Sequence, residues 1–178
     1  MQGEGLEREA IVQAALAMLA EGGEQGLTMR GLASRLGVTP MSLYHHVGDR
    51  AGLLRALSDQ VYGGVLTQAR SRSKDHGAKL RKLLMRYYEA VGEHPQLTLA
   101  MFNEPQAFAG VTVLITERLT ALLEAITPDA ELWRDILVDH AHGSALALVS
   151  AKGDPLLREH LQQRYAQALD GLLGRLAG

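Results

Sequence analysis

The sequence of 178 residues contains no cysteine. This absence excludes disulfide bonds, thiol catalysis and zinc sites built on cysteine. No apolar run approaches the ~20 residues that a membrane-spanning helix needs. The first residues, from Met1 to Glu7, are acidic where a secretory signal would be basic. We therefore expect a cytoplasmic chain with no membrane segment.

The sequence also lacks any convincing stretch in which apolar and polar residues alternate, so it offers no strand signal. Apolar residues recur instead at spacings of three and four, as in Ile11, Ala14 and Met18. Breaks fall at 22–23, 37, 48, 71–77, 95, 105, 127–128 and 153–155, where glycine, proline or polar residues gather. The pattern predicts an all-α fold of about nine helices, with the short helices first.

Two short helices near the N-terminus are bounded by clear capping residues. Thr28 suits the N-cap of a helix that ends at Gly37, where glycine can adopt the left-handed conformation. Thr39 suits the N-cap of the next helix, and Pro40 its first position. A turn of about three residues then joins the two helices, which predicts a helix-turn-helix unit.

The second of these helices separates into an inner and an outer side. Leu43 and Val47 complete the buried side, together with Leu32, Ala33 and Leu36 of the first helix. The outward residues can donate, accept or make methyl contacts with base edges in a DNA major groove, while Thr28, Arg30, Tyr44 and Arg50 suit phosphate contacts. The predicted DNA-binding residues are Thr28, Arg30, Thr39, Pro40, Met41, Ser42, Tyr44, His45, His46 and Arg50. The alternative is that the helix pair is only a packing motif.

This region resembles the TetR family of bacterial transcriptional repressors. The resemblance covers roughly the first 60 residues. It rests on Leu27-Thr28-Met29-Arg30, Leu32-Ala33, Leu36-Gly37-Val38, Ser42-Leu43-Tyr44, His46-Val47 and Leu53-Leu54, preceded by an amphipathic helix from about Leu6 to Leu19. The run "LYHHV" is similar to the branch that contains the tetracycline repressors. Two positions depart from the family pattern: Arg50 replaces a usual lysine, and His45 occupies a variable position.

The resemblance implies a homodimer with an N-terminal three-helix DNA-binding domain, residues 1–48, and a larger C-terminal helical domain for ligand binding and dimerisation, residues 49–178. The partners would be double-stranded operator DNA and a small-molecule effector. Candidate effector contacts are Tyr62, Tyr88, Met101, Phe102, His140 and Ser144, because apolar walls with a few polar groups suit small molecules. Each of these residues is also compatible with a plain core position.

The last two expected helices, 128–151 and 154–176, are the candidates for the dimer contact. The first carries a run of Ala, Gly and Ser that permits close approach, and the second has an apolar face too wide for one neighbour. The resemblance implies that the last two helices of two subunits form a four-helix bundle, in which this face packs against the second subunit. A purely intramolecular core helix is the alternative.

The remaining polar features give no sign of catalysis. His140 and His142 are two residues apart, about 200° around a helix, so they cannot chelate a metal ion from one side. We expect no metal, no cofactor and no enzymatic activity, since nothing resembles an activated nucleophile or a phosphate loop. The basic run from Arg70 to Arg86 is interpreted as a solvated loop and helix face.

The sequence therefore predicts a ligand-responsive DNA-binding transcriptional regulator, a repressor that a small-molecule effector releases from its operator. An effector-independent dimeric DNA-binding protein is the alternative.

Overall fold

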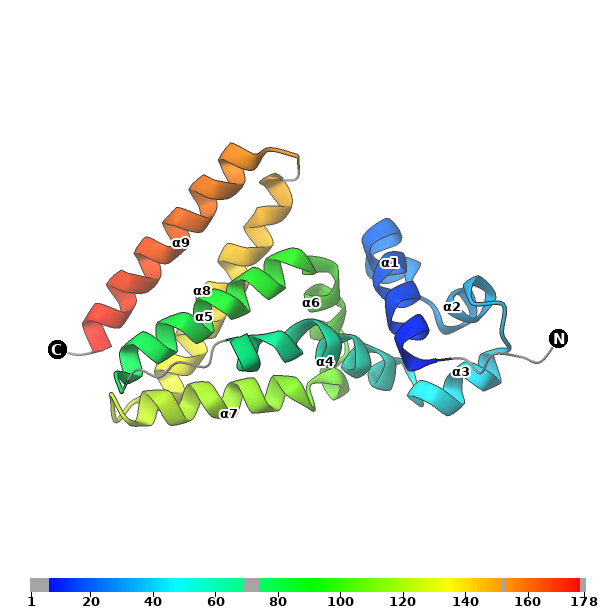
Figure 1. Ribbon diagram of the computed structural model, residues 1–178, viewed down its shortest axis with the longest axis horizontal. Helices are drawn as coiled ribbons and strands as arrows, with labels where there is room; N and C mark the ends of the chain where they lie inside the picture. Colours follow the sequence, from blue (N-terminus) through cyan, green and yellow to red (C-terminus); the bar gives the residue numbers. More distant parts are fainter. Residues whose placement is uncertain (1–6, 69–73, 152, 177–178) are drawn as a thin grey trace. The chain divides into compact units, whose positions relative to one another are not determined.

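The computed structural model describes residues 7–68, 74–151 and 153–176, and within these ranges the chain is all-α with no strand. The prediction of an all-α fold is confirmed. Its helices, in chain order, are α1 (Arg8–Gly26), α2 (Met29–Arg35), α3 (Pro40–Val47), α4 (Arg50–Gln68), α5 (His76–Glu93), α6 (Pro95–Phe102), the 3-10 helix η1 (Pro105–Ala107), α7 (Val111–Glu124), α8 (Ala130–Leu146), the 3-10 helix η2 (Ala147–Ala151) and α9 (Pro155–Leu176) (Figure 1).

The described residues divide into two compact units. The first contains residues up to Val61 together with 96–110, and the second contains 62–95 together with 111–178. The division falls inside α4, whereas the domain boundary predicted from the sequence follows residue 48. The predicted boundary concerns the functional domains, so it stays a prediction.

The first unit is built on α1, α2, α3, the N-terminal part of α4, and α6. Its core includes Ile11 and Ala15 from α1 and Leu53, Leu54 and Leu57 from α4, all fully buried. Burying a leucine side chain stabilises the fold by about 1.5–3 kcal/mol, so these buried side chains contribute to the stability of the unit.

Helix α1 differs from its sequence-based prediction in length. The helix continues to Gly26 instead of ending near Leu19, and only Gly23 leaves helical geometry, with φ of 61°. Glycine adopts this conformation without the steric cost that a Cβ atom would add. The predicted break at 22–23 is therefore a kink, while Leu6 lies outside the described residues.

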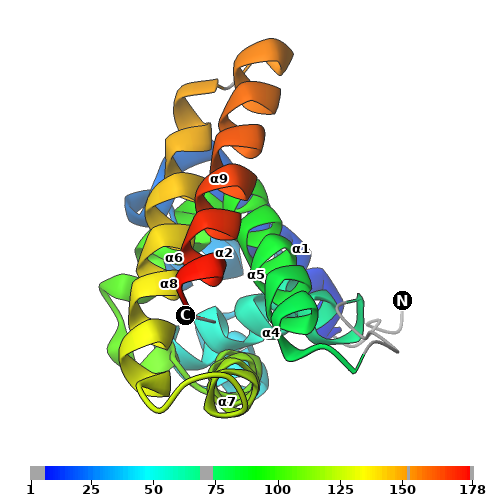
Figure 2. The same cartoon turned by 90° about the vertical axis from the view of Figure 1, so that its left-hand side faces the viewer.

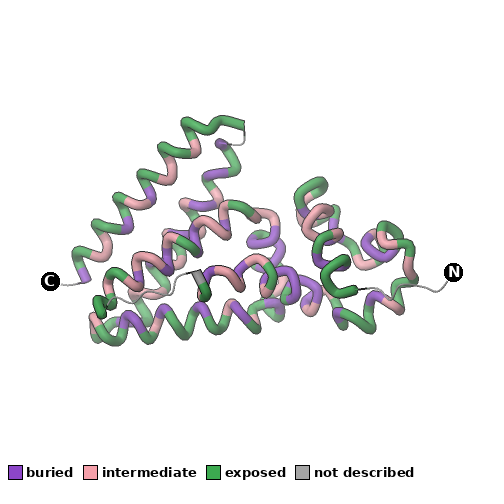
Figure 3. The backbone as a smooth tube through the Cα atoms, viewed as in Figure 1, coloured by how far each residue is buried: buried purple, intermediate pink, exposed green. Residues whose placement is uncertain are grey.

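The second unit is formed by α5, α7, α8 and α9, which pack on one another with the C-terminal part of α4 (Figure 2). Buried positions recur along α5 and α7 at helical spacing (Figure 3). In α5 they include Leu80, Leu84 and Val91. This spacing places one apolar stripe of the helix in the core and leaves the opposite face to solvent.

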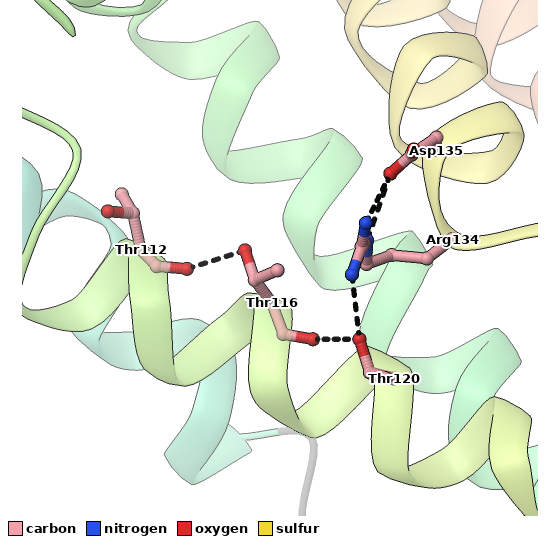
Figure 4. Close-up of polar contacts among 5 residues, drawn as sticks. All are labelled: Thr112, Thr116, Thr120, Arg134 and Asp135. Carbon is pink, nitrogen blue, oxygen red and sulfur yellow. Dashed lines mark hydrogen bonds and ion pairs between the residues drawn. The ribbon is translucent and has the colours of Figure 1, made fainter. Parts of the chain in front are cut away.

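A polar contact joins α7 to α8 beside this core (Figure 4). The Arg134 guanidinium donates to the Thr120 hydroxyl at 3.3 Å and to the Asp135 carboxylate at 2.9 Å. The Thr120 and Thr116 hydroxyls donate in turn to the backbone carbonyls of Thr116 and Thr112. These bonds satisfy the polar groups on the part of α7 that faces α8.

The end of α8 also differs from its prediction. We expected one helix over 128–151, but the α-helical part ends at Leu146 and continues as η2. This tighter turn buries Leu148, whose side chain lies directly against Gly92 of α5. Because 3-10 geometry commonly tightens the last turn of an α-helix, the packing of Leu148 accounts for the change.

Candidate nucleic-acid interface

Both short helices of the first unit begin at the predicted N-caps. The Thr28 hydroxyl accepts a hydrogen bond from the Gly31 N–H at 3.0 Å, and the Thr39 hydroxyl accepts one from the Ser42 N–H at 3.2 Å. Pro40 occupies the first turn of α3, and Gly37 has φ of 66° in the turn between the helices. A capped helix end satisfies donors that would otherwise lack partners, so α3 starts at a defined residue.

The inner side of the unit is packed as predicted, with one difference. Leu32, Ala33, Leu43 and Val47 are buried. Leu36 is only half-buried, because the α-helical geometry of α2 ends one residue before it. Since the buried side of α3 is held from within the unit, its other side is left for a partner.

The outer side of α3 carries the side chains predicted to contact DNA. Met41 is 65% exposed and Tyr44 is 43% exposed, although both are large and largely apolar. His45 and His46 are also exposed. Scattered exposed apolar residues are ordinary on protein surfaces, but here they share one short capped helix with two imidazole rings, which can donate and accept hydrogen bonds.

The remaining predicted DNA-binding residues surround this face. Thr28, Arg30, Thr39 and Pro40 are exposed, and Ser42 is half-buried next to the cap that its backbone N–H completes. Asp49 caps α4, since its carboxylate accepts from the Gly52 N–H at 2.8 Å.

Arg50 has an internal role that the sequence did not indicate. Its guanidinium donates to the Leu27 carbonyl oxygen at 2.6 Å and lies 3.5 Å from the Glu24 carboxylate. The Glu24 carboxylate also accepts from the Asn103 amide at 2.6 Å. Arg50 thus ties the start of α4 to the segment after α1, and the phosphate contact predicted for it would have to use its remaining N–H groups.

Arg35 forms a bidentate ion pair with Glu21, with N–O distances of 2.6 and 2.7 Å. The hydrogen bond that Arg35 donates holds the pKa of the Glu21 carboxyl below its ordinary value. Both side chains of this pair are exposed, so Arg35 lies on a solvated helix face.

The six predicted effector contacts are divided between the two units. Met101 and Phe102 belong to the first unit, whereas the other four belong to the second. Phe102 is exposed and stacks on Phe108, with ring centroids 6.2 Å apart. Tyr62 is buried against Tyr87 at a centroid distance of 6.0 Å. These residues have core or surface neighbours, and their role as ligand contacts stays a prediction.

Tyr88, His140 and Ser144 lie close to one another around Tyr165 of α9. The Tyr88 ring stacks on Tyr165 with centroids 4.0 Å apart and planes 9° apart, and the His140 ring lies 5.4 Å from the same tyrosine. The Tyr165 hydroxyl donates to the Leu84 carbonyl oxygen at 3.3 Å, and burial raises the Tyr165 pKa. The sequence predicted a wide apolar face on the helix 154–176, which contains Tyr165, and gave no sign that Tyr165 would meet His140.

An open groove of about 470 Å³ lies between α8 and α9 beside these rings. Its lining residues are Asp139, His140, Gly143, Ser144, Ala147, Leu161, Arg164, Tyr165 and Ala168. Among the described residues, the buried His140 Nε2 and the buried Tyr88 hydroxyl find no hydrogen-bond partner. Of these two residues, only His140 lines the groove, and an unpaired buried polar atom is uncommon in a folded protein.

His142 lies on another side of α8, as its spacing from His140 predicted. Its Nε2 atom and the Tyr87 hydroxyl form a hydrogen bond at 2.6 Å. Burial lowers the pKa of the His142 imidazole and raises that of the Tyr87 hydroxyl. No cluster of three or more metal-ligating side chains occurs in the part of the chain that the structure describes, and none of the helices described there is long and apolar enough to cross a bilayer.

Comparison with known proteins finds relatives for the N-terminal part of the chain. Residues 11–57 match the family described as bacterial regulatory proteins, tetR family. The tetracycline repressor protein class C of Escherichia coli is 33% identical over 97 residues, which cover 50% of this chain and 44% of that protein. The match therefore spans less than half the length of this relative.

Solved structures match along almost the whole chain. BioQ of Mycobacterium smegmatis has a TM-score of 0.77 at 24% identity, covering 97% of this chain and 98% of its own. The TetR family protein ActR of Streptomyces coelicolor, solved in complex with (S)-DNPA, has a TM-score of 0.74 at 22% identity, covering 98% of both chains. At these identities the structures establish the fold. The match to the family lies in residues 11–57, which include both capped helices and the outer face of α3. Residues 11–57 are therefore similar to the TetR family of bacterial regulatory proteins, and the described chain shares the fold of the solved structures compared with it.

Proposed function

We propose that this chain is a cytoplasmic, homodimeric transcriptional repressor that binds operator DNA and is released by a small-molecule effector. The observation that carries the proposal is the outer face of α3, where Met41, Tyr44, His45 and His46 are exposed on a helix whose start is fixed by the Thr39 cap. A helix of this kind fits the major groove of DNA, which is about 12 Å wide.

The side chains on and around this face suit two kinds of DNA contact, to base edges and to phosphates. The N-terminal residues of α3 lie where a recognition helix meets base edges, and Met41 offers an apolar contact for a thymine methyl group. The hydroxyl of Thr28 and the guanidinium of Arg30 would hold phosphates, which fix the orientation of the protein without reading sequence.

Dimerisation through α8 and α9 is supported by apolar side chains that face solvent in the single chain. Leu132 is 61% exposed and Ile136 39% exposed on α8, and Leu157 is 36% exposed on α9. Burying these side chains against a second copy would remove them from water. Two recognition helices in a dimer would then read half-sites about 34 Å apart, which is one turn of DNA.

Effector release rests on two supports. The second unit holds a groove lined by His140, whose buried Nε2 has no hydrogen-bond partner among the described residues, and ActR, which shares the fold, was solved with a small molecule. Suppose that the effector binds best to a dimer whose recognition helices are not at the operator spacing. Binding would then shift the population of dimers toward that state, which releases the operator.

The experiment is a selection of bound fragments from randomised duplex DNA by the purified protein, followed by sequencing. The wild type is expected to enrich a palindrome, and Tyr44→Ala is expected to lose that enrichment. Phe108→Ala is the matched control, because Phe108 is also aromatic and has nearly the same exposure, 42% against 43%, but lies outside α3. Failure of the folded wild-type dimer to enrich any site at low salt would refute the proposal.

Addition of a metabolite library to the protein bound to its selected site tests the effector part. Release by one compound class supports an effector-responsive repressor. Binding that no compound changes would favour a dimeric DNA-binding protein without an effector.

A further inference from the structure

One basic side chain joins the two ends of the helix-turn-helix segment. Arg50 is the first residue of α4, and its Nη1 atom donates to the carbonyl oxygen of Leu27 at 2.6 Å. Leu27 directly precedes Thr28, the N-cap of α2. Helices α2 and α3 therefore lie wholly between the two residues that this hydrogen bond connects, and the bond fixes where the segment begins and where it ends.

The carboxylate of Glu24 connects this bond to a third segment of the chain. Its Oε1 atom lies 3.5 Å from Nη2 of Arg50, and its Oε2 atom accepts a hydrogen bond from the Asn103 amide at 2.6 Å. Glu24 comes from the end of α1, and Asn103 directly follows α6. All of these residues belong to the first unit, which includes 96–110. We call Glu24, Leu27, Arg50 and Asn103 the base cluster.

A second contact brings α6 against the kink of α1. A Cβ atom at Gly23 would lie 3.1 Å from Oε1 of Gln96, which stands near the start of α6. Gly23 has φ of 61°, a conformation that glycine adopts at little cost. Gln96 and Asn103 thus meet the end of α1 from the two ends of α6. The bond between Asn103 and Glu24 is therefore part of a packed contact between helices.

The guanidinium of Arg50 already has partners for its charge and for two of its nitrogen atoms. Its side chain is 31% exposed, as is that of Glu24. A guanidinium presents separate N–H donors in a fixed fork, so it can serve two acceptors at once. The nearby carboxylate also offsets the attraction between this guanidinium and a phosphate. These contacts favour an internal role for Arg50 over a contact with DNA.

We propose that Arg50 is a positioning residue and not a phosphate contact, and that Glu24 and Asn103 act through it to hold α3 in place. Residue 103 then contributes to DNA binding, although it lies far along the chain from α3. A helix that is held in advance loses less conformational freedom when it binds. The inference rests on the proposed function, because it concerns how the same DNA-binding face is held.

Variants of Arg50 separate positioning from a phosphate contact. Arg50→Lys keeps the positive charge but offers one nitrogen in place of two, so we expect it to bind the selected site about 3- to 10-fold more weakly. Arg50→Gln is expected to weaken binding without changing its salt dependence. Loss of a phosphate contact would instead reduce the slope of log affinity against log salt by about 0.9, and Arg30→Gln, at a proposed phosphate contact, provides that comparison.

Two results with the Arg50 variants would overturn the proposal. The first is wild-type affinity of Arg50→Lys, because a phosphate contact needs only the charge. The second is a slope reduced by about 0.9 in Arg50→Gln.

Variants of Glu24 and Asn103 test the residues that act through Arg50. Glu24→Gln removes a negative charge, which by itself favours DNA binding, yet we expect binding to weaken about 3- to 10-fold. Asn103→Ala changes no charge and is expected to weaken binding by a similar factor. Glu9→Gln on the same helix and Gln106→Ala in the same segment are matched controls and are expected to bind like the wild type. Wild-type affinity of Glu24→Gln and Asn103→Ala would overturn their role.

Hydrogen exchange of the free protein tests the positioning without DNA. Amides of α3 are expected to exchange faster in Asn103→Ala and Arg50→Gln than in the wild type, while amides of α5, in the second unit, keep their rates. Unchanged exchange in α3 would overturn the proposal. Equally faster exchange in both helices would indicate a general loss of stability and would overturn it as well.

The outcomes are distinguishable from those of the proposed function. If the DNA selection enriches no site, the proposed function fails, and hydrogen exchange still decides for or against the base cluster. If a site is enriched and the base-cluster variants bind it with wild-type affinity, the repressor stands and the positioning role fails.

Discussion

Met41 and Leu43 lie two residues apart on α3 and separate the folding role of this helix from its binding role. Leu43 is fully buried, whereas Met41 is 65% exposed. Leu43→Ala removes a core side chain and leaves a cavity, which costs about 2–5 kcal/mol of unfolding free energy. That loss is a large part of the about 5–15 kcal/mol that stabilises an ordinary domain. Met41→Ala changes a solvated position and is expected to alter the unfolding free energy by no more than about 0.5 kcal/mol.

The same two substitutions should change DNA binding for different reasons. Met41→Ala deletes an apolar contact to the groove, so the folded protein is expected to bind its selected site about 5- to 150-fold more weakly, equivalent to about 1–3 kcal/mol. Leu43→Ala is expected to lose binding in step with loss of helical circular dichroism.

Urea denaturation at fixed protein concentration and fluorescence anisotropy with the selected duplex would measure the two effects. Unchanged affinity of Met41→Ala would refute the assignment of α3 as the recognition helix. Unchanged stability of Leu43→Ala would refute the packing argument.

Three further predictions concern single contacts. Gly52→Ala would place a methyl group against the Val47 carbonyl oxygen, so the turn between α3 and α4 must shift. Urea denaturation should show a loss of unfolding free energy of about 1–3 kcal/mol, and operator affinity should fall. Wild-type stability and affinity would contradict this. Burial lowers the pKa of His142, so this side chain binds a proton more readily in the unfolded chain. The unfolding free energy should therefore decline as the pH falls below about 6.5, and His142→Phe should weaken that decline. An identical pH profile of the variant would exclude His142 as the cause of the decline. Asp170→Asn breaks an exposed ion pair with Arg81 (2.6 Å), and thermal denaturation should show a loss below about 1 kcal/mol that shrinks with added salt, whereas a larger, salt-independent loss would contradict a screened surface pair.

The sequence was most informative where the relevant interaction is local. Thr28 and Thr39 cap their helices within three residues of their partners, and Gly37 adopts the positive φ that its place after a helix predicted. Caps and turns depend on neighbouring residues in the chain, so their chemistry is readable in the order of amino acids. The same holds for the alternation of Leu43 and Val47 with exposed residues along α3, which follows from helical periodicity.

Contacts between distant segments were decided by the tertiary structure. Arg50 donates to the carbonyl oxygen of Leu27, 23 residues earlier, and no sequence pattern distinguished that bond from a phosphate contact. His140 and Tyr165 meet beside one groove, although the sequence placed one among candidate ligand contacts and the other on a helix with a wide apolar face. Periodicity defines which face of each helix is apolar, but the rotation and offset of one helix against another follow from the packing of all their side chains together, and that packing made the groove.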